Sequence, residues 1–352
     1  MPDWTKPMKQ TYEYYTVDPA TWRDEAPLNN IKSCTITRDS TVETLGSASI
    51  EMNELVGECY VRAYLVTIQN GITDRYVLGT FLIQTPSTTF DGKVRGVSVD
   101  AYTPLIELKE NPPPIGYSIF KGENIMQQAA MICREQLRAP VVAAECSETL
   151  YSDFVANTDD TWITFISDLI SNAKYELDMD ELGRILFCPQ QKASALQPVY
   201  TYEDNGTSIL QPKITMEHDI YGVPNAVEVI YSKNGEHYYA KVVNDDPNSP
   251  TSTVSRGREI LSRVTDPEMG GTPTEDQIKL YAEETLKSVS SLEYSVSYTH
   301  GYNSTRVGEC VRLNYSRAGL VDVKAKIVSQ SIKCEPGCQV TEKAVFTVNT
   351  WR

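Results

Sequence analysis

Metal binding and acid–base catalysis both favour histidine, and this chain has three. His218, His237 and His300 each lie in strand-like sequence. None is within the spacing of a metal motif from another histidine or from a cysteine. A zinc site would therefore need distant residues to converge, and the sequence favours surface or partly packed imidazoles instead.

Thiol chemistry is the next candidate. Eight cysteines spread over 352 residues are too dilute for a disulfide scaffold and indicate a reducing compartment. Only Cys334 and Cys338 lie close together, on either side of the turn formers Glu335-Pro336-Gly337. Two states of this pair remain open: a disulfide across the hairpin, or two reduced thiols that flank the turn. Because no second pair has matching spacing, the two thiols do not predict a metal site.

One acidic segment has the outline of a calcium loop. Residues 178–183 read Asp-Met-Asp-Glu-Leu-Gly. Leu182, however, occupies a ligand position, and Pro189 stands where the bidentate glutamate belongs. The segment is therefore predicted to be an acidic hairpin turn.

Signatures of catalysis are missing from the sequence. There is no Gly-x-Ser-x-Gly elbow, no Walker loop and no dinucleotide fingerprint. The adjacent carboxylates Asp159-Asp160 and Glu283-Glu284 point in different directions on a helix, so they do not form a glycosidase pair. Capping or a solvated helix surface explains both pairs. The sequence thus predicts no catalytic, cofactor-binding or metal-binding residue, and a protein that is not an enzyme.

Tyrosine is abundant, with 21 residues. Its clusters lie at 12–15, 200–202 and 238–239. Tyrosine is enriched where proteins meet, because it combines a large contact area with a polar tip. It is also favoured on pleated strand surfaces, so interface use and plain strand packing both remain open.

The first section of the chain, from Ile31 to Tyr102, consists mainly of short strand-like segments. Ala48, Ile50 and Met52 alternate with polar residues, and 60–68, 76–83 and 94–102 are strand-like. Turns are expected at Asn70-Gly71 and at 88–92. The pattern predicts a β domain with one face buried.

A different composition begins at Asn111-Pro112-Pro113-Pro114, where three prolines cannot continue a β ladder. Apolar residues at helical spacing predict one short helix in 122–137 and a second over 162–173, with an N-cap within 158–160. Segments 175–179 and 184–187 predict a hairpin. The middle section is therefore an expected α+β packing module.

From Lys213 onward strands dominate again, with one helix. Thr272-Pro273-Thr274-Glu275 has the form of a capping box, which predicts a helix near 273–289. Strands are expected at 227–231 and 238–243 around Asn234-Gly235, and at 311–315 and 321–327 around 316–319. Two last strands, near 328–333 and 343–348, bracket the Cys334 turn.

The chain is thus predicted to be mainly β with an α+β middle section. The domains are expected at 1–110, 111–212 and 213–352. Net charge is −15, and each third has more acidic than basic residues. Such a surface repels a nucleic-acid duplex, although solubility alone also explains acidity. No apolar run approaches the roughly 20 residues that span a bilayer, and the N-terminus does not have the form of a secretory signal.

The segment 222–265 carries a family resemblance. It reads GVPNAVEVIYSKNGEHYYAKVVNDDPNSPTSTVSRGREILSRVT and is followed by an amphipathic helix and VGECVRLNY. As a whole it resembles the C-terminal part of the baseplate hub proteins of phage tails, which are also found in contractile injection particles. Val307-Gly308-Glu309 stands where that family more often has Gly-Asp before a strand. The candidate assembly loop and the Gly-Arg pair after it comprise Asn244, Asp245, Asp246, Pro247, Ser249, Pro250, Gly257 and Arg258.

The resemblance implies two tube-like β domains that flank the α+β domain. It also implies a homotrimeric ring between the sixfold tail tube and the threefold central spike, with a channel through which DNA passes. The implied partners are the tail tube protein, the distal tube ring, the spike and other baseplate proteins, with no specific nucleic-acid binding and no membrane insertion. The implied location is the virion baseplate, assembled in the host cytoplasm.

Two other functions remain open. A receptor-binding or carbohydrate-binding tail protein would also be rich in strands and tyrosine. A tail-associated cell-wall hydrolase is the second alternative, and the missing catalytic signatures count against it. Glycan binding or peptidoglycan turnover by the purified chain would discriminate them.

Overall fold

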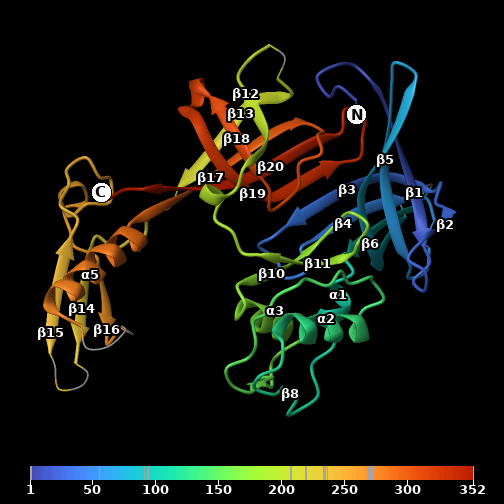
Figure 1. Cartoon of the computed structure of the whole chain (residues 1–352). Coiled ribbons are helices and arrows are strands. Elements are labelled where there is room, and N and C mark those ends of the chain that lie inside the picture. Colours follow the sequence, from blue (N-terminus) through green and yellow to red (C-terminus); the bar gives the residue numbers. More distant parts are fainter. Residues whose placement is uncertain are drawn as a thin grey trace. The chain divides into compact units, whose positions relative to one another are not determined.

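Strands account for most of the regular structure of this chain (Figure 1). The computed structural model describes residues 2–54, 56–90, 92, 95–206, 208–218, 220–232, 235, 237–267 and 273–351. Its helices are few and gather in the middle section and near residue 280. The predicted fold class, mainly β with an α+β middle section, is confirmed.

The elements follow one another in four groups. The first strands are β1 (Lys9–Val17), β2 (Asp24–Pro27), β3 (Ile31–Asp39), β4 (Gly46–Met52), β5 (Tyr60–Gln69), β6 (Ile72–Phe90) and β7 (Arg95–Tyr102). The middle section has α1 (Ile106–Glu110), β8 (Ser118–Ile119), α2 (Ile125–Gln136), β9 (Phe154–Val155), α3 (Trp162–Ser171), β10 (Tyr175–Met179), β11 (Ile185–Pro189) and η1 (Ala193–Ala195). Then come β12 (Pro198–Glu203), β13 (Leu210–His218), β14 (Ala226–Tyr231), β15 (Tyr238–Val243), α4 (Thr253–Arg256), β16 (Leu261–Thr265) and α5 (Glu275–Val289). The last group is β17 (Ser291–Gly301), β18 (Cys310–Tyr315), η2 (Ser316–Ala318), β19 (Leu320–Lys333) and β20 (Gln339–Asn349).

Two compact units divide these elements. Unit 1 comprises Met1–Ile214 and Ser297–Ala344, and unit 2 comprises Thr215–Val296 and Val345–Arg352. The expected boundary at 212/213 lies close to the first break between the units, whereas the one at 110/111 falls inside unit 1. The two units group the residues differently from three consecutive domains, and the three-domain division stays a prediction.

The β section at the start of unit 1 follows the sequence pattern closely. In β4, Ala48, Ile50 and Met52 are buried, as their alternation predicts. The β5–β6 hairpin turns at Asn70 and Gly71, which both have positive φ, the conformation of a tight two-residue turn. β6 runs on to Phe90, paired with Arg95 of β7, so the predicted turn at 88–92 lies further along the chain. Of the turn residues 91–94, only Gly92 is described.

One strand joins the first and last β sections of unit 1. The first part of β19 pairs with β18, from Leu320 opposite Tyr315 to Lys326 opposite Cys310. Its last part, Ser329–Lys333, pairs with β3 instead. Strands from both ends of the sequence therefore belong to one 13-stranded sheet, with β19 between the two sections.

The continuity of β19 corrects the prediction of two separate strands at 321–327 and 328–333. The predicted alternation of buried and exposed residues also fails at the start of β19, because Val321 is exposed while Leu320 is buried. Asp322 has a positive φ, and the β18–β19 register shifts between Tyr315 and Leu313. Such a bulge moves the following side chains to the other face, so Ala325 is buried as predicted.

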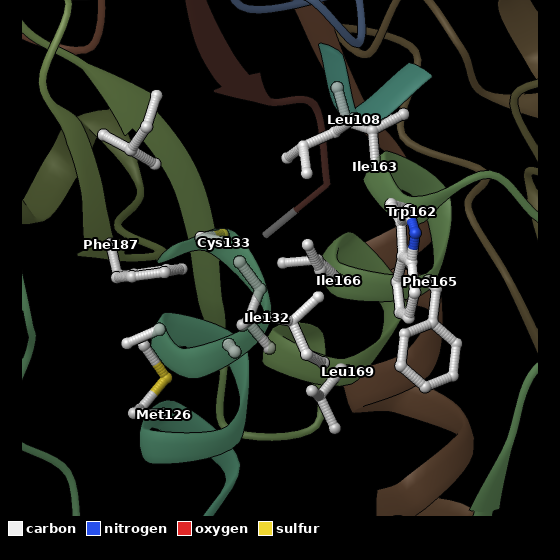
Figure 2. Packing of buried hydrophobic residues seen from close by; sticks show 14 of the residues in the cluster. Leu108, Met126, Ile132, Cys133, Trp162, Ile163, Phe165, Ile166, Leu169 and Phe187 are labelled. Carbon is white, nitrogen blue, oxygen red and sulfur yellow. The ribbon is translucent and has the colours of Figure 1, made fainter. Parts of the chain in front are cut away.

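The middle section has its own apolar core. Helices α2 and α3 pack side by side, with Ile132 and Cys133 of α2 near Ile166 and Leu169 of α3 (Figure 2). Both helices and the β10–β11 hairpin are confirmed. Phe187 of β11 packs in the same cluster. The section is the packing module that its apolar spacing predicts.

An N-cap residue was predicted for α3 and for α5, and both predictions were wrong. Helix α3 is capped by Thr161, whose hydroxyl accepts from the Thr164 backbone, and not by residues 158–160. Helix α5 is capped by Thr274 in a capping box with Gln277, so the predicted box at 272–275 is displaced by two residues. Thr272 itself lies outside the described residues. In both cases a later threonine with a better-placed partner three residues on takes the cap.

In unit 2, a three-stranded sheet in the order β15-β14-β16 is covered on one face by α5. Ile278, Ala282 and Leu286 of α5 are fully buried against β14 and β15, as their spacing predicts. The β14–β15 pairing confirms the two expected strands. Asn234 of the expected turn lies outside the described residues. In the described part of the chain, no helix combines the length and apolar character that a membrane crossing requires.

Candidate assembly site

The candidate assembly loop in unit 2 is ordered by its own side chains. Asn244 and Ser249 are buried, and the Asn244 amide donates to the Ser249 hydroxyl at 2.9 Å. The Ser249 hydroxyl lies 3.1 Å from the Thr251 hydroxyl, which also contacts Thr350 at 2.8 Å. These polar groups are satisfied inside the unit and are not available to a partner.

Asn225 ties the two ends of this loop together. Its side-chain amide donates to the carbonyls of Thr251 and Arg258, at 3.1 and 3.0 Å. Its side-chain oxygen accepts from the Ile260 backbone at 2.7 Å. Sequence reasoning missed Asn225, because a single asparagine before a strand carries no motif. At the other end of the loop, the Asn244 backbone N–H donates to the Asn225 carbonyl at 2.8 Å, so one fully buried residue bonds both ends.

Among the remaining predicted residues, Gly257 has a special backbone conformation, and the others differ in how exposed they are. Gly257 ends α4 with φ of 63°, the left-handed conformation that favours glycine at a helix end. Asp245, Pro247, Pro250 and Arg258 are exposed. Gly257 is exposed as well, and Asp246 is half-buried.

A charged face lies on the side of the unit 2 sheet opposite α5. Glu228 of β14 forms ion pairs with Arg263 of β16 at 2.9 Å and Lys241 of β15 at 4.0 Å. The Tyr239 hydroxyl donates to Glu228 at 3.1 Å. The hydrogen bond from Arg263 lowers the pKa of the Glu228 carboxyl below its ordinary value. Tyr239 is 56% exposed, which makes it the candidate contact residue of this face.

Another candidate surface is a strand edge in unit 1. Pairing of β6 with β5 ends at Leu82, whereas pairing with β7 continues to Phe90. Among the described strands, the stretch of β6 from 84 to 90 therefore has a neighbour on one side only. Phe90 at its end is 69% exposed. An exposed strand edge of this kind is a ready template for pairing with another chain.

A polar cluster is sealed inside the later β section of unit 1. The Glu342 carboxylate accepts from Tyr298 at 2.7 Å and from Gln330 at 2.6 Å. The Thr305 hydroxyl donates to it at 2.9 Å, and the His300 ring nitrogen Nε2 lies 3.3 Å away. Glu342 and His300 are fully buried. The five side chains form a satisfied buried network, and full burial separates them from any substrate in solvent.

The acidic hairpin turn between β10 and β11 anchors the middle section to the first β section. The Leu182 carbonyl accepts from the Trp22 ring nitrogen at 2.7 Å and from Arg62 at 3.1 Å. Glu181 forms ion pairs with Arg38 at 3.3 Å and Arg306 at 2.8 Å. The sequence identified the turn but not this role. Glu181 of this turn pairs with arginines distant in sequence, whereas Asp180 pairs with Arg184 of the same hairpin.

The other chemistry-bearing residues stay apart. His218 stacks on Tyr294 with ring centroids 4.8 Å apart, and His237 is exposed. Within the described ranges no three histidine, cysteine or carboxylate side chains are placed to hold a metal ion. All eight cysteines are free thiols, and Cys334 and Cys338 are both buried.

The tyrosine clusters divide between packing and exposure. Tyr14 and Tyr202 are buried, and Tyr202 joins the Glu342 network through a 3.3 Å hydrogen bond. The Tyr12 hydroxyl donates to the Glu335 carbonyl at 2.7 Å. Contacts within the chain therefore account for these three, whereas Tyr239 is exposed.

Comparison with known proteins gives a fold likeness and no sequence family. No family model and no curated protein sequence matches the chain. Among solved structures, the tail protein from Neisseria meningitidis MC58 matches with a TM-score of 0.61 and 12% identity, over 96% of this chain and 97% of that one. The 43 kDa tail protein of prophage MuSo2 from Shewanella oneidensis has a TM-score of 0.62 at 12% identity, over 95% and 98%. Prophage tail protein gp18 from Listeria monocytogenes EGD-e has a TM-score of 0.51 at 12% identity, over 96% and 95%.

These matches span almost the whole of both chains in each case. At 12% identity they show the fold alone. The chain thus has the fold of these tail proteins over almost its whole length.

Proposed function

We propose that this chain is the structural baseplate hub of a phage tail or related contractile particle. Three copies form a ring that joins the sixfold tail tube to the threefold central spike. The observation that carries the proposal is the fold likeness to tail proteins over nearly the whole of both chains. A likeness of this extent leaves little of the chain for an added module with a separate function.

The continuous sheet of unit 1 supports a wall-forming role. β19 belongs both to the section with β3 and to the section with β18, so each subunit contributes two β sections that are joined by one strand. Three subunits then supply six β sections, which matches a sixfold tube on one side and threefold symmetry on the other. Closing the ring also covers strand edges such as that of β6, which otherwise invite aggregation.

The proposed partners follow from this position in the particle. They are two further copies of the chain, the tail tube protein and its distal ring, the central spike and other baseplate proteins. DNA passes through the channel without specific contacts, since a net charge of −15 repels phosphates. The proposed location is the virion baseplate, after assembly in the host cytoplasm and without membrane insertion.

A role without catalysis is part of the proposal. A group of histidine, carboxylate and tyrosine in close contact surrounds Glu342, and both Glu342 and His300 are fully buried. Tyr298, Gln330 and Thr305 all donate to the one buried carboxylate, which is the arrangement of a structural network.

Mass and symmetry of the purified full chain test the proposal. Light scattering is expected to give three times the 39.4 kDa subunit mass, and electron microscopy a threefold ring with a central channel. If the chain stays monomeric alone, the same measurements are made after co-expression with the tail tube protein of the same particle. A monomer under both conditions, or a hydrolytic activity on peptidoglycan, contradicts the proposal.

A matched pair of variants locates the ring contact. Phe90→Ser removes the exposed aromatic at the β6 edge and is expected to weaken trimerisation about tenfold, because truncation of an aromatic contact residue typically costs more than 1 kcal/mol. Ile115→Ser removes an apolar side chain that is fully exposed, on the middle section, and is expected to leave the trimer unchanged. Equal effects of the two variants would show that the β6 edge is not the contact.

A further inference from the structure

Cys34 and Cys334 are direct neighbours across two strands of unit 1. The β3–β19 register pairs Thr35 with Lys333, so the next pair along the ladder is Cys34 opposite Cys334. The Cys334 backbone N–H donates to the Cys34 carbonyl at 2.9 Å. The two residues come from opposite ends of the sequence. They lie next to the last residue pair of the β3–β19 ladder, Thr35 and Lys333.

Both side chains enter the same core. Cys34 is 3% exposed and Cys334 is 8% exposed, and the two lie in one apolar cluster with Ile36 and Ile332. Hydrogen bonding to the Cys34 thiol, together with burial, raises the pKa of Cys334 well above its ordinary value. The two residues are therefore opposite in register, with both thiols buried in one apolar cluster.

This placement fits the geometry of a disulfide. Opposite residues in an antiparallel pair have Cα atoms about 4.5 to 5.5 Å apart. Disulfides bridge Cα separations of about 4.4 to 6.8 Å. The Cα separation expected for this register is therefore within the range that a disulfide bridges.

Cys338, the nearest cysteine in sequence, is held differently. It follows the turn after β19, and its backbone N–H donates to the Glu335 carbonyl at 2.9 Å. Burial raises the pKa of its thiol to about 12. The spacing of Cys334 and Cys338 in sequence suggests a pair, but the strand register places Cys34 opposite Cys334.

We propose that Cys34 and Cys334 are a redox-sensitive pair that closes into a disulfide when the protein meets a small disulfide oxidant such as oxidised glutathione. One thiolate attacks the oxidant and releases one reduced glutathione. The second thiol then displaces the other glutathione, so two cysteine thiols are oxidised and one disulfide is reduced to two thiols. The new bond ties β3 to the residue that follows β19.

The bond would be a covalent cross-link between segments near the two ends of the chain. It encloses about 300 residues, and the stabilisation from a disulfide grows with the length of the loop that it closes. In a reducing compartment the pair stays open, and outside it the pair closes. Because both thiols are buried and Cys334 has a raised pKa, the folded protein is expected to react more slowly than the refolding chain.

Oxidative refolding of the full chain tests the proposal. The protein is unfolded in urea, refolded in a buffer of oxidised and reduced glutathione, and the remaining thiols are alkylated without reduction. Peptide mapping is expected to show a cross-linked peptide containing Cys34 and Cys334, with Cys133 alkylated as an internal control. Thermal unfolding is expected to shift upward by roughly 5 °C or more relative to the reduced protein.

Two single variants separate the pairings. Cys338→Ser is expected to keep the cross-linked peptide and the thermal shift, whereas Cys34→Ala is expected to lose both. A Cys334–Cys338 cross-link, or eight alkylated cysteines in the refolded wild-type protein, would overturn the proposal. The wild-type measurement stands by itself if a variant fails to fold.

Discussion

At the scale of single residues, the chemistry that the sequence offers is used for internal structure. His300 could be located in a strand from its neighbours, but nothing local pairs it with Glu342, because the two meet only through strands of the same sheet. The sequence likewise did not identify Asn225 and Glu181 as residues that make long-range contacts. Each bonds to groups that are distant in sequence, such as the Arg258 carbonyl and Arg306.

The Glu342 network predicts a specific dependence of stability on pH. Burial alone would raise the pKa of Glu342, but hydrogen bonds from His300, Tyr298 and Gln330 hold it below the ordinary value of 4.5. A depressed pKa gives stability that is complete above about pH 4.5 and is lost as the pH falls through the folded-state value. Glu342→Gln is expected to reduce the free energy of unfolding by about 3 kcal/mol at pH 7, with a smaller deficit at pH 3.

Urea unfolding between pH 7 and pH 3 measures this effect. Glu51→Gln, a change on the exposed side of β4, serves as the control and is expected to stay within about 0.5 kcal/mol of wild type. A deficit in the Glu342 variant that is the same at both pH values would argue against an ionised carboxylate in the network.

At the scale of elements, the structure shows which sequence patterns are sufficient. Alternation located β4, and an Asn-Gly pair located the β5–β6 turn, because these signals depend only on adjacent residues. The break in alternation near Asp322 could not be predicted, since a bulge depends on how β18 and β19 pair. The caps of α3 and α5 were displaced for a related reason. Several adjacent polar residues can cap a helix, and packing selects one.

The β10–β11 turn provides a test at this scale. Gly183 has φ of 76°, and a Cβ there would lie 3.0 Å from the Thr80 Cβ and 3.1 Å from the Trp22 ring. Gly183→Ala is therefore expected to cost about 2 to 4 kcal/mol, from the unfavourable backbone conformation together with the steric clash. Gly116→Ala has a similar φ of 78° with nothing within 4 Å, so it is expected to cost only about 1 kcal/mol.

Chemical denaturation of the two glycine variants makes the comparison. Since both have the same backbone penalty, the difference between them measures the contact of the turn with the sheet. Equal losses of stability would mean that the turn moves away from Thr80 without cost.

At the scale of the whole molecule, the fold class followed from strand patterns, but the assignment of strands to sheets did not. Nothing in the sequence shows that β3 and β19 are neighbours, because their pairing depends on residues about 300 positions apart. The candidate loop at 244–252 was located correctly as a loop. Its buried hydrogen bonds could not be foreseen, since they involve Asn225 and Thr350.

The two compact units predict that a core change in one need not unfold the other. Leu286 of α5 is fully buried in the core of unit 2, so Leu286→Ala is expected to cost about 2 to 5 kcal/mol there. Hydrogen exchange is expected to speed up in β14 and β15 while the protection of β4 and β5 is retained. Leu280→Ala removes a side chain from the same helix that is 55% exposed, and is expected to leave both units unchanged. Equal acceleration of exchange in both units would mean that they unfold together.

The position of β19 also affects how the protein is made. β3 emerges early from the ribosome, but its neighbour β19 is complete only when residue 333 has been translated. At about 5 to 20 residues per second, the nascent chain holds this side of β3 open for roughly 15 to 60 seconds. During that interval β3 is an unprotected edge on which two growing chains can pair wrongly, so synthesis at high local concentration favours aggregation before the last strands are made.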